Sequence, residues 1–447
     1  MKNIFVMGAG QSSSYLIKYL LEEAVKHNWF VTVGDMNVSL SRAIVNGHPC
    51  GNAIEFDVND TQLRNKLIEQ SDIVVNLLIP RFQYLVALDC LRFGKNLVTA
   101  SYENPRVAEL NNDAIRSGIL ILNEMGLDPG IDHMSAMSII RRIKDNGGWV
   151  NSFISYGSGI PAPEVKSNPL NYCITWNPTN IVKAGEAGAQ YLEDGKIKML
   201  PYHEVFRRTW EVEIEGLGTF EAYPNRDSLI YQKIFNLEKM NTMIRGTLRY
   251  PGWSETWYQI IKLGLPLDTL TLPDISEMTY AEFTEMFLPL NVTGNKLEAR
   301  VANYLNISPT GGIMKNLKWL GLFSNQKIGK NFKTAVELMT DLIVKKMPLP
   351  EESRDMVILH HIIEAFYPNK KEKVISTLVD YGEPDSKITA IAKTVGAPAA
   401  IAVKLILLNE LPLTGCHIPI HPIIYTKVLD ELKTLGIYFT EKIEAIN

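Results

Sequence analysis

The first part of the chain alternates between short apolar runs and segments whose apolar residues recur at helical spacing. The segment 12–27, for example, places Leu16 and Leu20 on one helical face. Strands alternating with helices predict a parallel sheet covered on both faces, because right-handed crossovers place helices there. The expected strands are 4–7, 30–34, 73–78, 97–100 and 119–123, and the expected helices are 12–27, 83–92 and 105–117.

The alternation ends at 126–130, and the remaining chain mixes helical stripes, strand-like runs and long loops. Residues 355–366 are apolar at both odd and even positions, which is typical of a strand buried on both faces. The expected strands here are 150–156, 210–214, 219–223, 355–366 and 373–381, and the expected helices are 132–144, 296–305, 334–344, 399–408 and 423–435.

These patterns predict an α/β fold, with a Rossmann-type doubly wound parallel sheet and a second α/β substrate domain that carries a helical insertion. We expect a dinucleotide-binding domain over 1–127 and a helical insertion over 265–346. The substrate-binding and dimerisation domain is expected over 128–264 and 347–415, and the segment 416–447 is expected to pack back on the first domain.

Composition narrows the classes of partner. The 447 residues include 45 basic and 49 acidic ones, without a long run of like charge, so we expect no nucleic-acid binding. The four cysteines lack CxxC spacing, and no signal-peptide pattern opens the sequence, which favours a cytoplasmic protein. The apolar stretch 397–408 is interrupted by Lys404 and is too short to span a bilayer, so we expect no membrane segment.

A glycine turn follows the first predicted strand and leads directly into the first predicted helix. In a dinucleotide fingerprint, the first glycine permits the tight turn and the second lets the pyrophosphate approach the backbone at a helix N-terminus. Serine occupies the position of the third glycine. The expected cofactor-binding residues of this turn are Gly8, Gly10, Gln11, Ser12 and Ser13.

Asp35 ends the second predicted strand and bears on the choice of cofactor. A carboxylate at this position accepts hydrogen bonds from the ribose hydroxyls of NAD and repels the 2′-phosphate of NADP. Met36 and Asn37 follow, and no arginine lies next to Asp35. The sequence therefore favours NAD over NADP.

Polar residues also gather where loops follow the predicted strands, in 99–102, 126–134, 156–169 and 223–228. Ligands of open α/β sheets bind outside the carboxyl ends of strands, and the first two of these segments are expected to lie there. Arg226 and Arg249 lie in strand or turn contexts, and a guanidinium grips a carboxylate with two hydrogen bonds. A surface ion pair is the commoner role of any single arginine.

Several of these segments together resemble the saccharopine dehydrogenase family, of the L-glutamate-forming type. The resemblance rests on GLDPGIDHM at 126–134, PAPE at 161–164, NPL at 168–170, YPNRDS at 223–228 and RGTLRY at 245–250, and it continues through 392–396 and 398–405. The GLDPG run is shared with carboxynorspermidine- and homospermidine-forming enzymes, whereas NRD and TLR are more specific to saccharopine enzymes.

The resemblance implies a homodimer that oxidises saccharopine, a tricarboxylate amine, through an imine to L-glutamate and 2-aminoadipate 6-semialdehyde in lysine metabolism. It implies that Asp128 and Tyr102 perform the acid–base chemistry. Implied nucleotide contacts, beyond the glycine turn, are Asp35, Asp57, Ile79, Thr99, Ala100, Gly126, Leu127 and Asp128. Implied substrate contacts are Ser101, Tyr102, Asp128, Arg226, Thr247, Leu248 and Arg249.

Two positions depart from the family pattern. Gly157 stands where the family usually has a cysteine, and Tyr84 where a histidine is usual, which puts thiol-assisted proton transfer and some local contacts in doubt. Other titratable residues favour structural roles: His133 as a capping or packing group, and His360 and His361 within an apolar strand. Cys416, His417 and His421 lack a recognised metal spacing, so no metal is expected.

Two other functions compete with saccharopine oxidation. A carboxynorspermidine- or homospermidine-type reductase would act on a more positively charged substrate and would need acidic residues where Arg226 and Arg249 stand. A non-catalytic NAD-sensing regulator would keep the glycine turn but lose the acid–base group. The presence of Asp128 and both arginines argues against each alternative.

Overall fold

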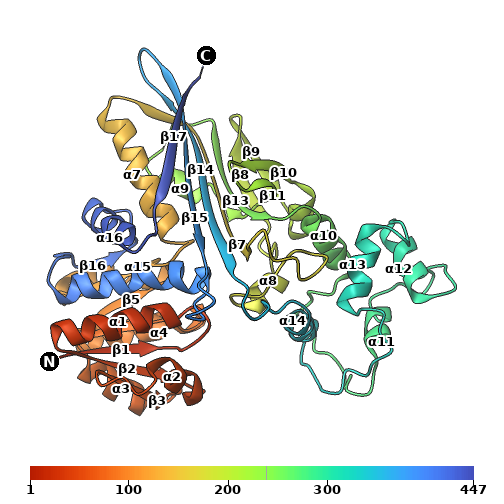
Figure 1. The fold of residues 1–447 in the computed structure, drawn as a ribbon, viewed down its shortest axis with the longest axis horizontal. Coiled ribbons are helices and arrows are strands. Elements are labelled where there is room, and N and C mark those ends of the chain that lie inside the picture. The colour runs from red at the N-terminus through yellow and green to blue at the C-terminus, as the bar shows by residue number, and fades with distance from the viewer. Residues whose placement is uncertain (238, 447) are drawn as a thin grey trace. The chain divides into compact units, whose positions relative to one another are not determined.

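The computed structural model describes residues 1–237 and 239–446, which group into two compact units (Figure 1). Unit 1 comprises Met1–Val150, Met356–His361 and the chain from Ala365 onward. Unit 2 comprises Asn151–Asp355 and Ile362–Glu364. This division keeps the segment 265–346 within unit 2 and groups the chain after 365 with the first part of the sequence, whereas the predicted boundaries were 127, 264, 346 and 415.

Unit 1 is built on a seven-stranded sheet whose strands all pair in parallel, which confirms the predicted Rossmann-type fold. The strand order is β16-β6-β5-β4-β1-β2-β3. The strands are β1 (Lys2–Met7), β2 (Trp29–Asp35), β3 (Gly51–Glu55), β4 (Ile73–Asn76), β5 (Asn96–Thr99), β6 (Leu120–Leu122) and β16 (Gly415–His417). The sequence pattern missed β3, because this edge strand has no fully buried residue and therefore no apolar run.

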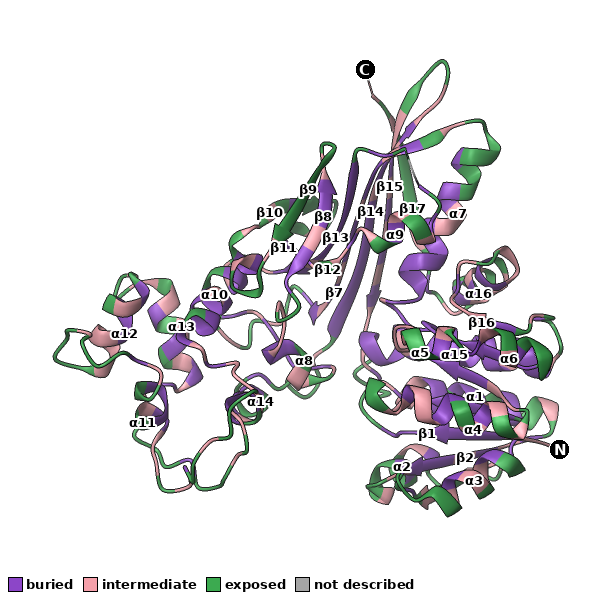
Figure 2. Cartoon of the chain, turned by 180° about the vertical axis from the view of Figure 1, so that it is seen from behind, coloured by how far each residue is buried: buried purple, intermediate pink, exposed green. Residues whose placement is uncertain are grey.

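Helices on the faces of this sheet bury their apolar sides, as the alternating pattern predicted (Figure 2). They are α1 (Ser14–His27), α2 (Val38–Val45), α3 (Thr61–Gln70), α4 (Gln83–Phe93), α5 (Pro105–Ala108) and α6 (Asn111–Arg116), with a short 3₁₀ turn η1 (Pro80–Phe82). The next helix, α7 (Ile131–Asp145), lies away from this sheet, and its Ser135 hydroxyl is 2.8 Å from His361 Nε2. The predicted helix 105–117 is divided into α5 and α6. At the division Leu110 N–H donates to Val107 O, three residues back rather than four.

The last part of the chain completes unit 1. Three of its strands, β14 (Asp355–Phe366), β15 (Lys371–Tyr381) and β17 (Phe439–Ala445), are consecutive neighbours in a second sheet. Two helices, α15 (Ala390–Leu407) and α16 (Pro422–Thr434), come before and after β16 in the chain, and β16 pairs with β6 of the first sheet. α15 begins earlier than predicted and contains Pro398. It packs closely on α1, since a Cβ at Gly396 would lie 2.8 Å from the backbone nitrogen of Leu16.

Among the described residues, α15 is also the helix that is long and apolar enough to cross a membrane by length and composition alone. However, 89% of its apolar window is buried within the structure. The core helix of a water-soluble domain has the same composition, because it is covered by protein on every side. Its apolar character is accounted for by this packing.

Unit 2 holds a mixed sheet in which β10 (Trp210–Ile214), β11 (Gly218–Pro224), β13 (Thr242–Arg249) and β7 (Trp149–Pro161) are consecutive neighbours. Three further strands, β8 (Ala189–Glu193), β9 (Lys196–Leu200) and β12 (Arg226–Asp227), pair beside them. Its helices are α8 (Pro178–Val182), α9 (Ile230–Ile234), α10 (Trp253–Leu263), α11 (Tyr280–Glu285), α12 (Leu297–Leu305), α13 (Gly312–Leu320) and α14 (Ala335–Lys346), with a 3₁₀ segment η2 (Tyr202–Arg207). This mixed second sheet with helices confirms the predicted second α/β domain.

His360 on β14 gives unit 1 a defined pH dependence. The ring is 4% exposed, and its Nδ1 lies 2.8 Å from Thr377 Oγ1. Burial, and then the nearby charge of Lys373, lower the pKa of His360 from 6.5 to about 4. Between these values the unfolded chain binds the proton and the folded chain does not, so stability is lost as the pH falls.

We therefore expect the free energy of unfolding to fall by up to about 3 kcal/mol between pH 6.5 and pH 4 on account of His360. Urea unfolding of the wild type and of His360→Gln across this range measures the effect. The variant lacks the titrating group, so its curve should lose less stability toward acid. Parallel curves for the two proteins would show that His360 does not titrate as stated.

Candidate functional site

The glycine turn joins β1 to α1 and leaves its backbone open to a ligand. Gly8 has φ +105°, and a Cβ there would lie 3.3 Å from the backbone of Leu77, so the turn itself requires glycine. Gly10 has neither constraint, since its φ is not positive and a Cβ would meet nothing within 4 Å. A glycine that the fold does not require fits the close approach of a pyrophosphate to the backbone.

The N-terminus of α1 is suited to an anion. Ser13 at the N-cap makes no side-chain capping bond, because its hydroxyl donates instead to Gly10 O at 2.7 Å, and the first turn contains no acidic residue. Free backbone N–H groups and the positive end of the helix dipole therefore remain for a phosphate. Ser13 itself is buried beneath the turn, whereas Gly10 and Gln11 are exposed.

Asp35 is the last residue of β2, as predicted, and both of its carboxylate oxygens accept backbone hydrogen bonds. Oδ2 accepts the N–H of Ala9 in the glycine turn at 2.8 Å, and Oδ1 accepts the N–H of Asn37 at 2.8 Å. The side chain therefore ties the end of β2 to the turn between β1 and α1. Two further predicted contacts, Asp57 and Ile79, are exposed in loops that follow β3 and β4.

The loops after β5 and β6 bring together the two predicted acid–base residues. Tyr102 Oη donates to Oδ1 of Asp128 at 2.8 Å, and both side chains are half-buried. Met125 N–H donates to Thr99 O at 2.9 Å, which fixes one loop against the other. A phenol hydrogen-bonded to a carboxylate is a pair that can donate or accept a proton.

The GLDPG segment folds into a tight turn that requires its glycines. The peptide bond between Asp128 and Pro129 is cis, and Gly126 N–H donates to Pro129 O at 3.0 Å. A Cβ at Gly130, whose φ is +146°, would lie 2.0 Å from Gly126 O. The turn therefore places Asp128 two residues before the N-cap of α7, with no room for larger residues at Gly130.

In unit 2, Arg249 at the end of β13 is a buried cation without a carboxylate partner. The residue is 4% exposed, and no carboxylate among the described residues lies within ion-pair distance of it. One terminal nitrogen donates to Leu248 O at 2.8 Å and to Ser158 Oγ at 3.3 Å, while no described atom bonds to Nε. A buried, uncompensated guanidinium is prepared for an anionic ligand.

Three aromatic rings surround this guanidinium. Its central carbon lies 4.9 Å from the ring centroid of Tyr172, 5.6 Å from that of Trp253 and 5.7 Å from that of Tyr223. Cation–π attraction partly compensates the buried charge without neutralising it. The aromatic residues therefore hold Arg249 in place and keep its positive charge available.

The other predicted substrate contacts of unit 2 lie in different surroundings. Arg226 is exposed, has φ +52° and follows β11, so its side chain lies on the outside of the unit. Thr247 is half-buried, whereas the side chain of Leu248 is fully buried in the core and can offer a ligand only its backbone. Of the two predicted arginines, only Arg249 occupies a desolvated position.

Comparison with known proteins places this geometry in a family. The profile described as Saccharopine dehydrogenase NADP binding domain matches residues 4–122, and the one described as Saccharopine dehydrogenase C-terminal domain matches residues 126–437. The chain belongs to the saccharopine dehydrogenase family. This finding confirms the resemblance seen in the sequence.

Two fungal members of the saccharopine dehydrogenase family are similar over nearly their whole length. The "Saccharopine dehydrogenase [NADP(+), L-glutamate-forming]" of Schizosaccharomyces pombe is 30% identical, and that of Saccharomyces cerevisiae is 32% identical, with 99% of each chain covered in both comparisons. The solved apo structure of the L-Glu-forming saccharopine dehydrogenase from Saccharomyces cerevisiae matches with a TM-score of 0.88 and 30% identity, covering 100% of both chains.

The two departures from the saccharopine dehydrogenase pattern have simple structural settings. Gly157 lies on β7 and pairs with Thr247 of β13, and the next residue, Ser158, donates to Leu248 O at 2.7 Å. The ring of Tyr84 on α4 is covered by the guanidinium of Arg106, 3.8 Å from its centroid. Sequence reasoning missed Ser158, although its position directly after Gly157 could have drawn attention to it.

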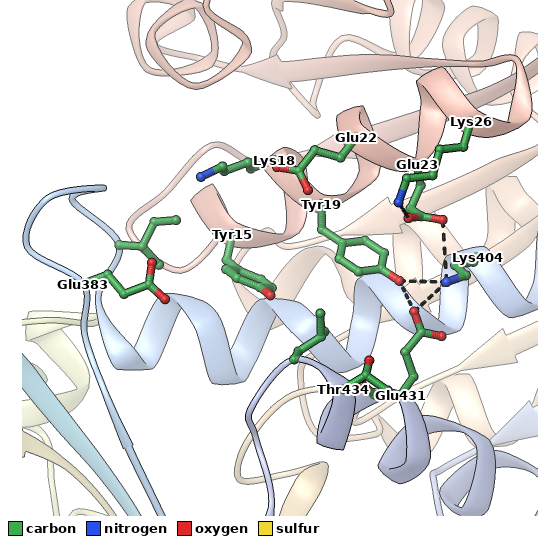
Figure 3. A pocket seen from close by; sticks show the side chains of 12 residues that line it. Tyr15, Lys18, Tyr19, Glu22, Glu23, Lys26, Glu383, Lys404, Glu431 and Thr434 are labelled. Carbon is green, nitrogen blue, oxygen red and sulfur yellow. Dashed lines mark hydrogen bonds and ion pairs between the residues drawn. The ribbon is translucent and has the colours of Figure 1, made fainter.

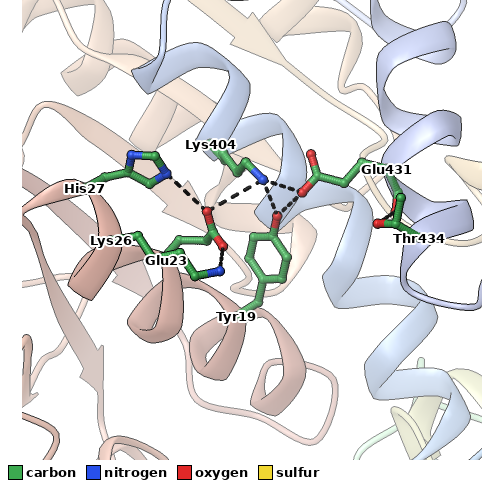
Figure 4. A network of polar contacts seen from close by, with 7 residues as sticks. All are labelled: Tyr19, Glu23, Lys26, His27, Lys404, Glu431 and Thr434. Carbon is green, nitrogen blue, oxygen red and sulfur yellow. Dashed lines mark hydrogen bonds and ion pairs between the residues drawn. The ribbon is translucent and has the colours of Figure 1, made fainter.

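A polar cavity of about 400 Å³ lies between α1, α15 and α16 (Figure 3). Its charged groups already neutralise one another: Lys404 Nζ lies 2.6 Å from Glu431 and 3.6 Å from Glu23, and Tyr19 donates to Glu431 (Figure 4). Although burial opposes it, the ammonium groups of Lys26 and Lys404 hold the pKa of Glu23 below its usual range. This network joins the three helices and does not indicate a ligand.

We also searched the described side chains for groups that could bind a metal ion. Within residues 1–237 and 239–446, no group of three or more His, Cys, Asp or Glu side chains is arranged to hold a metal ion. His417 and His421 lie with ring centroids 6.4 Å apart, and His417 Nε2 contacts Thr414 O at 3.0 Å.

The contrast between Gly8 and Gly10 provides a test of the cofactor site. Gly10→Ala should leave the melting temperature nearly unchanged, because the added methyl enters open space, and should weaken dinucleotide binding roughly tenfold or more by obstructing the phosphates. Gly8→Ala should instead destabilise the fold, since alanine is strained at φ +105°. Thermal unfolding and a nicotinamide fluorescence titration measure both effects, and unchanged binding in Gly10→Ala would remove the turn from the cofactor site.

Proposed function

We propose that this protein oxidises saccharopine to L-glutamate and 2-aminoadipate 6-semialdehyde, with a nicotinamide dinucleotide as hydride acceptor. The observation that carries the choice of substrate is the buried guanidinium of Arg249, which has no carboxylate partner within the described protein. Saccharopine is an amine with three carboxylates, so it supplies the missing anion. The fungal relatives that match over 99% of this chain are named for this reaction.

The energetics favour a carboxylate ligand over a structural role for Arg249. Burying a cation without an anion costs several kcal/mol in effective terms, of which cation–π contacts return about 0.5–2 kcal/mol each. A folded chain would relieve this cost by placing Asp or Glu nearby, as it does for the buried Arg64, whose guanidinium lies 2.6 Å from Asp89. At Arg249, a carboxylate of the substrate supplies the negative charge that the protein lacks.

Asp128 and Tyr102 supply the proton transfers of this reaction. The substrate amine must lose its proton before hydride leaves the adjacent carbon, and water must be activated to hydrolyse the resulting imine. The carboxylate of Asp128 accepts the first proton, and the Tyr102 hydroxyl, 2.8 Å from Oδ1, orients that carboxylate. Protonated Asp128 can then return a proton to the nitrogen that departs with glutamate.

The nicotinamide dinucleotide of this proposal is either NAD or NADP. The preference for NAD predicted from Asp35 has no support among the relatives, since those named here carry NADP(+) in their names and the matching N-terminal domain is described as NADP binding. The structure offers one reason why the rule applied to Asp35 is weakened: both carboxylate oxygens already accept backbone N–H groups. The homodimer and the cytoplasmic location stay predictions.

Turnover of saccharopine, followed by the absorbance of reduced nicotinamide, tests the function directly. Arg249→Lys keeps the charge but loses the planar fork, so the KM for saccharopine should rise roughly tenfold to a hundredfold, with the KM for the dinucleotide unchanged. Asp128→Asn should lower kcat by about a hundredfold or more. The matched control is Arg208→Lys, an arginine that also lies near an aromatic ring but already has a carboxylate partner.

Each alternative function has a distinct outcome in this assay. Turnover of carboxynorspermidine without turnover of saccharopine would identify the related reductase activity. Dinucleotide binding without turnover of either substrate would identify a sensor. Both results contradict saccharopine oxidation. Gly10→Ala, which should weaken dinucleotide binding without changing the melting temperature, is the control that the protein is folded and binds the dinucleotide at the glycine turn.

The charge of Asp35 can be tested separately from its hydrogen bonds. Asp35→Asn keeps a carbonyl oxygen for one backbone N–H but removes the negative charge, so kcat/KM with NADP should improve roughly tenfold relative to that with NAD. Asp60→Asn, at the N-cap of α3, is the control for loss of one negative charge elsewhere in the same unit. An unchanged NADP to NAD ratio in Asp35→Asn would mean that Asp35 does not select the cofactor.

A further inference from the structure

His133 lies in the first turn of α7, buried between two carboxylates. Its Nε2 is 3.0 Å from Glu124 Oε2, and its Nδ1 is 3.1 Å from Asp132 Oδ2. The histidine is 1% exposed, and the two carboxylate residues are nearly as buried. Neutral imidazole carries a proton on one nitrogen, whereas imidazolium carries one on each, so two flanking carboxylates favour the charged ring.

One of these carboxylates is bonded to the loop that carries Tyr102. The second oxygen of Glu124, Oε1, accepts the backbone N–H of Glu103 at 2.9 Å. Glu103 follows Tyr102 directly in the sequence, and the N–H of Glu124 donates to Ser101 O at 3.0 Å. The position of Glu124 therefore determines the position of the backbone on either side of Tyr102.

The other carboxylate is bonded to the turn that carries Asp128. The second oxygen of Asp132, Oδ1, accepts the backbone N–H of Gly130 at 2.7 Å. Since Tyr102 Oη donates to Asp128 Oδ1 at 2.8 Å, the contacts form a closed ring that runs through both loops and returns at His133. Every contact of this ring lies within unit 1.

The backbone at Glu124 indicates that this closed ring of contacts is under constraint. This residue has φ +61°, a left-handed conformation that is strained for a non-glycine residue. Such a conformation persists where the surroundings hold it, and here three contacts do so, through the backbone and both carboxylate oxygens. The contact with His133 is the one of these three that involves a second side chain, so a substitution at His133 removes it while Glu124 keeps the other two.

We propose that His133 is a positioning residue for the acid–base pair: its imidazolium, held between Glu124 and Asp132, locks the two loops so that Tyr102 stays hydrogen-bonded to Asp128. It acts through the carboxylates and needs no contact with the substrate. The kinetic consequence rests on the proposed function, whereas the consequence for the Tyr102–Asp128 hydrogen bond does not.

A second buried histidine of unit 1 has a different environment. His361 of β14 stacks on Phe439, with ring centroids 5.5 Å apart, and its Nε2 lies 2.8 Å from the hydroxyl of Ser135. His133 instead separates two buried carboxylates, which would repel each other across the gap if an uncharged residue replaced it. The closed ring of contacts that includes Tyr102 and Asp128 therefore depends on the charge of His133 as well as on its volume.

The kinetic test uses His133→Gln in the wild type and in a Tyr102→Phe background. In the wild type, kcat with saccharopine should fall roughly tenfold or more, while the KM for the dinucleotide stays within about twofold. In Tyr102→Phe, where the hydrogen bond to Asp128 is already absent, the same substitution should change kcat by less than about threefold. His360→Gln, a buried histidine outside the ring, should leave kcat unchanged in both backgrounds.

Since His133→Gln carries a risk of misfolding, Glu124→Gln provides a second route to the same result. Glutamine keeps an acceptor for the Glu103 N–H but removes the charge that faces His133, so it should reproduce the loss of kcat and the same dependence on Tyr102. A loss of kcat that is equally large in the Tyr102→Phe background would overturn the proposal, because the effect would then not pass through the Tyr102–Asp128 pair.

An activity-independent measurement separates this inference from the proposed function. In protein labelled at the tyrosine ζ carbon, the Tyr102 resonance is assigned by its absence in Tyr102→Phe. His133→Gln and Glu124→Gln should shift this resonance, and His360→Gln should not. If the wild type proves inactive on saccharopine, a shifted resonance still supports the positioning role while the function fails, and an unshifted one overturns the role whatever the activity.

Discussion

Two backbone hydrogen bonds between the ends of β5 and β6 support the chemistry of unit 1. Met125 N–H donates to Thr99 O at 2.9 Å, and Glu124 N–H donates to Ser101 O at 3.0 Å. Neighbouring parallel strands end at the same edge of a sheet, so their loops leave side by side. The pairing continues beyond the strands themselves and thereby brings a phenol from one loop to a carboxylate from the other.

Charge is distributed differently in two polar clusters of this protein. Between α1, α15 and α16, lysines and glutamates satisfy one another and leave no net demand for a ligand. At Arg249 the protein supplies aromatic rings and a hydroxyl but no anion. A buried charge that the protein satisfies only in part is costly, and this cost is the basis for the proposed role of Arg249 in substrate binding.

The sequence predicted those features that depend on local pattern. Parallel strands buried on both faces appear as apolar runs, and the glycine turn is visible because it follows a strand and precedes a helix. The strands β3 and β9 were missed because edge strands lack such runs. His133 appeared to be a packing residue, since one of its partners, Glu124, comes from the far side of a folded turn, and no spacing rule reveals that contact.

The return of β16 to β6 has a consequence for how the chain acquires its structure. The edge of β6 and the face of α1 that receives α15 stay uncovered until residues after 390 have been made, while all of Asn151–Asp355 is synthesised in between. An open strand edge beside an apolar surface is prone to pair with other chains. The parallel sheet of unit 1 is therefore completed only when the last part of the chain has been made.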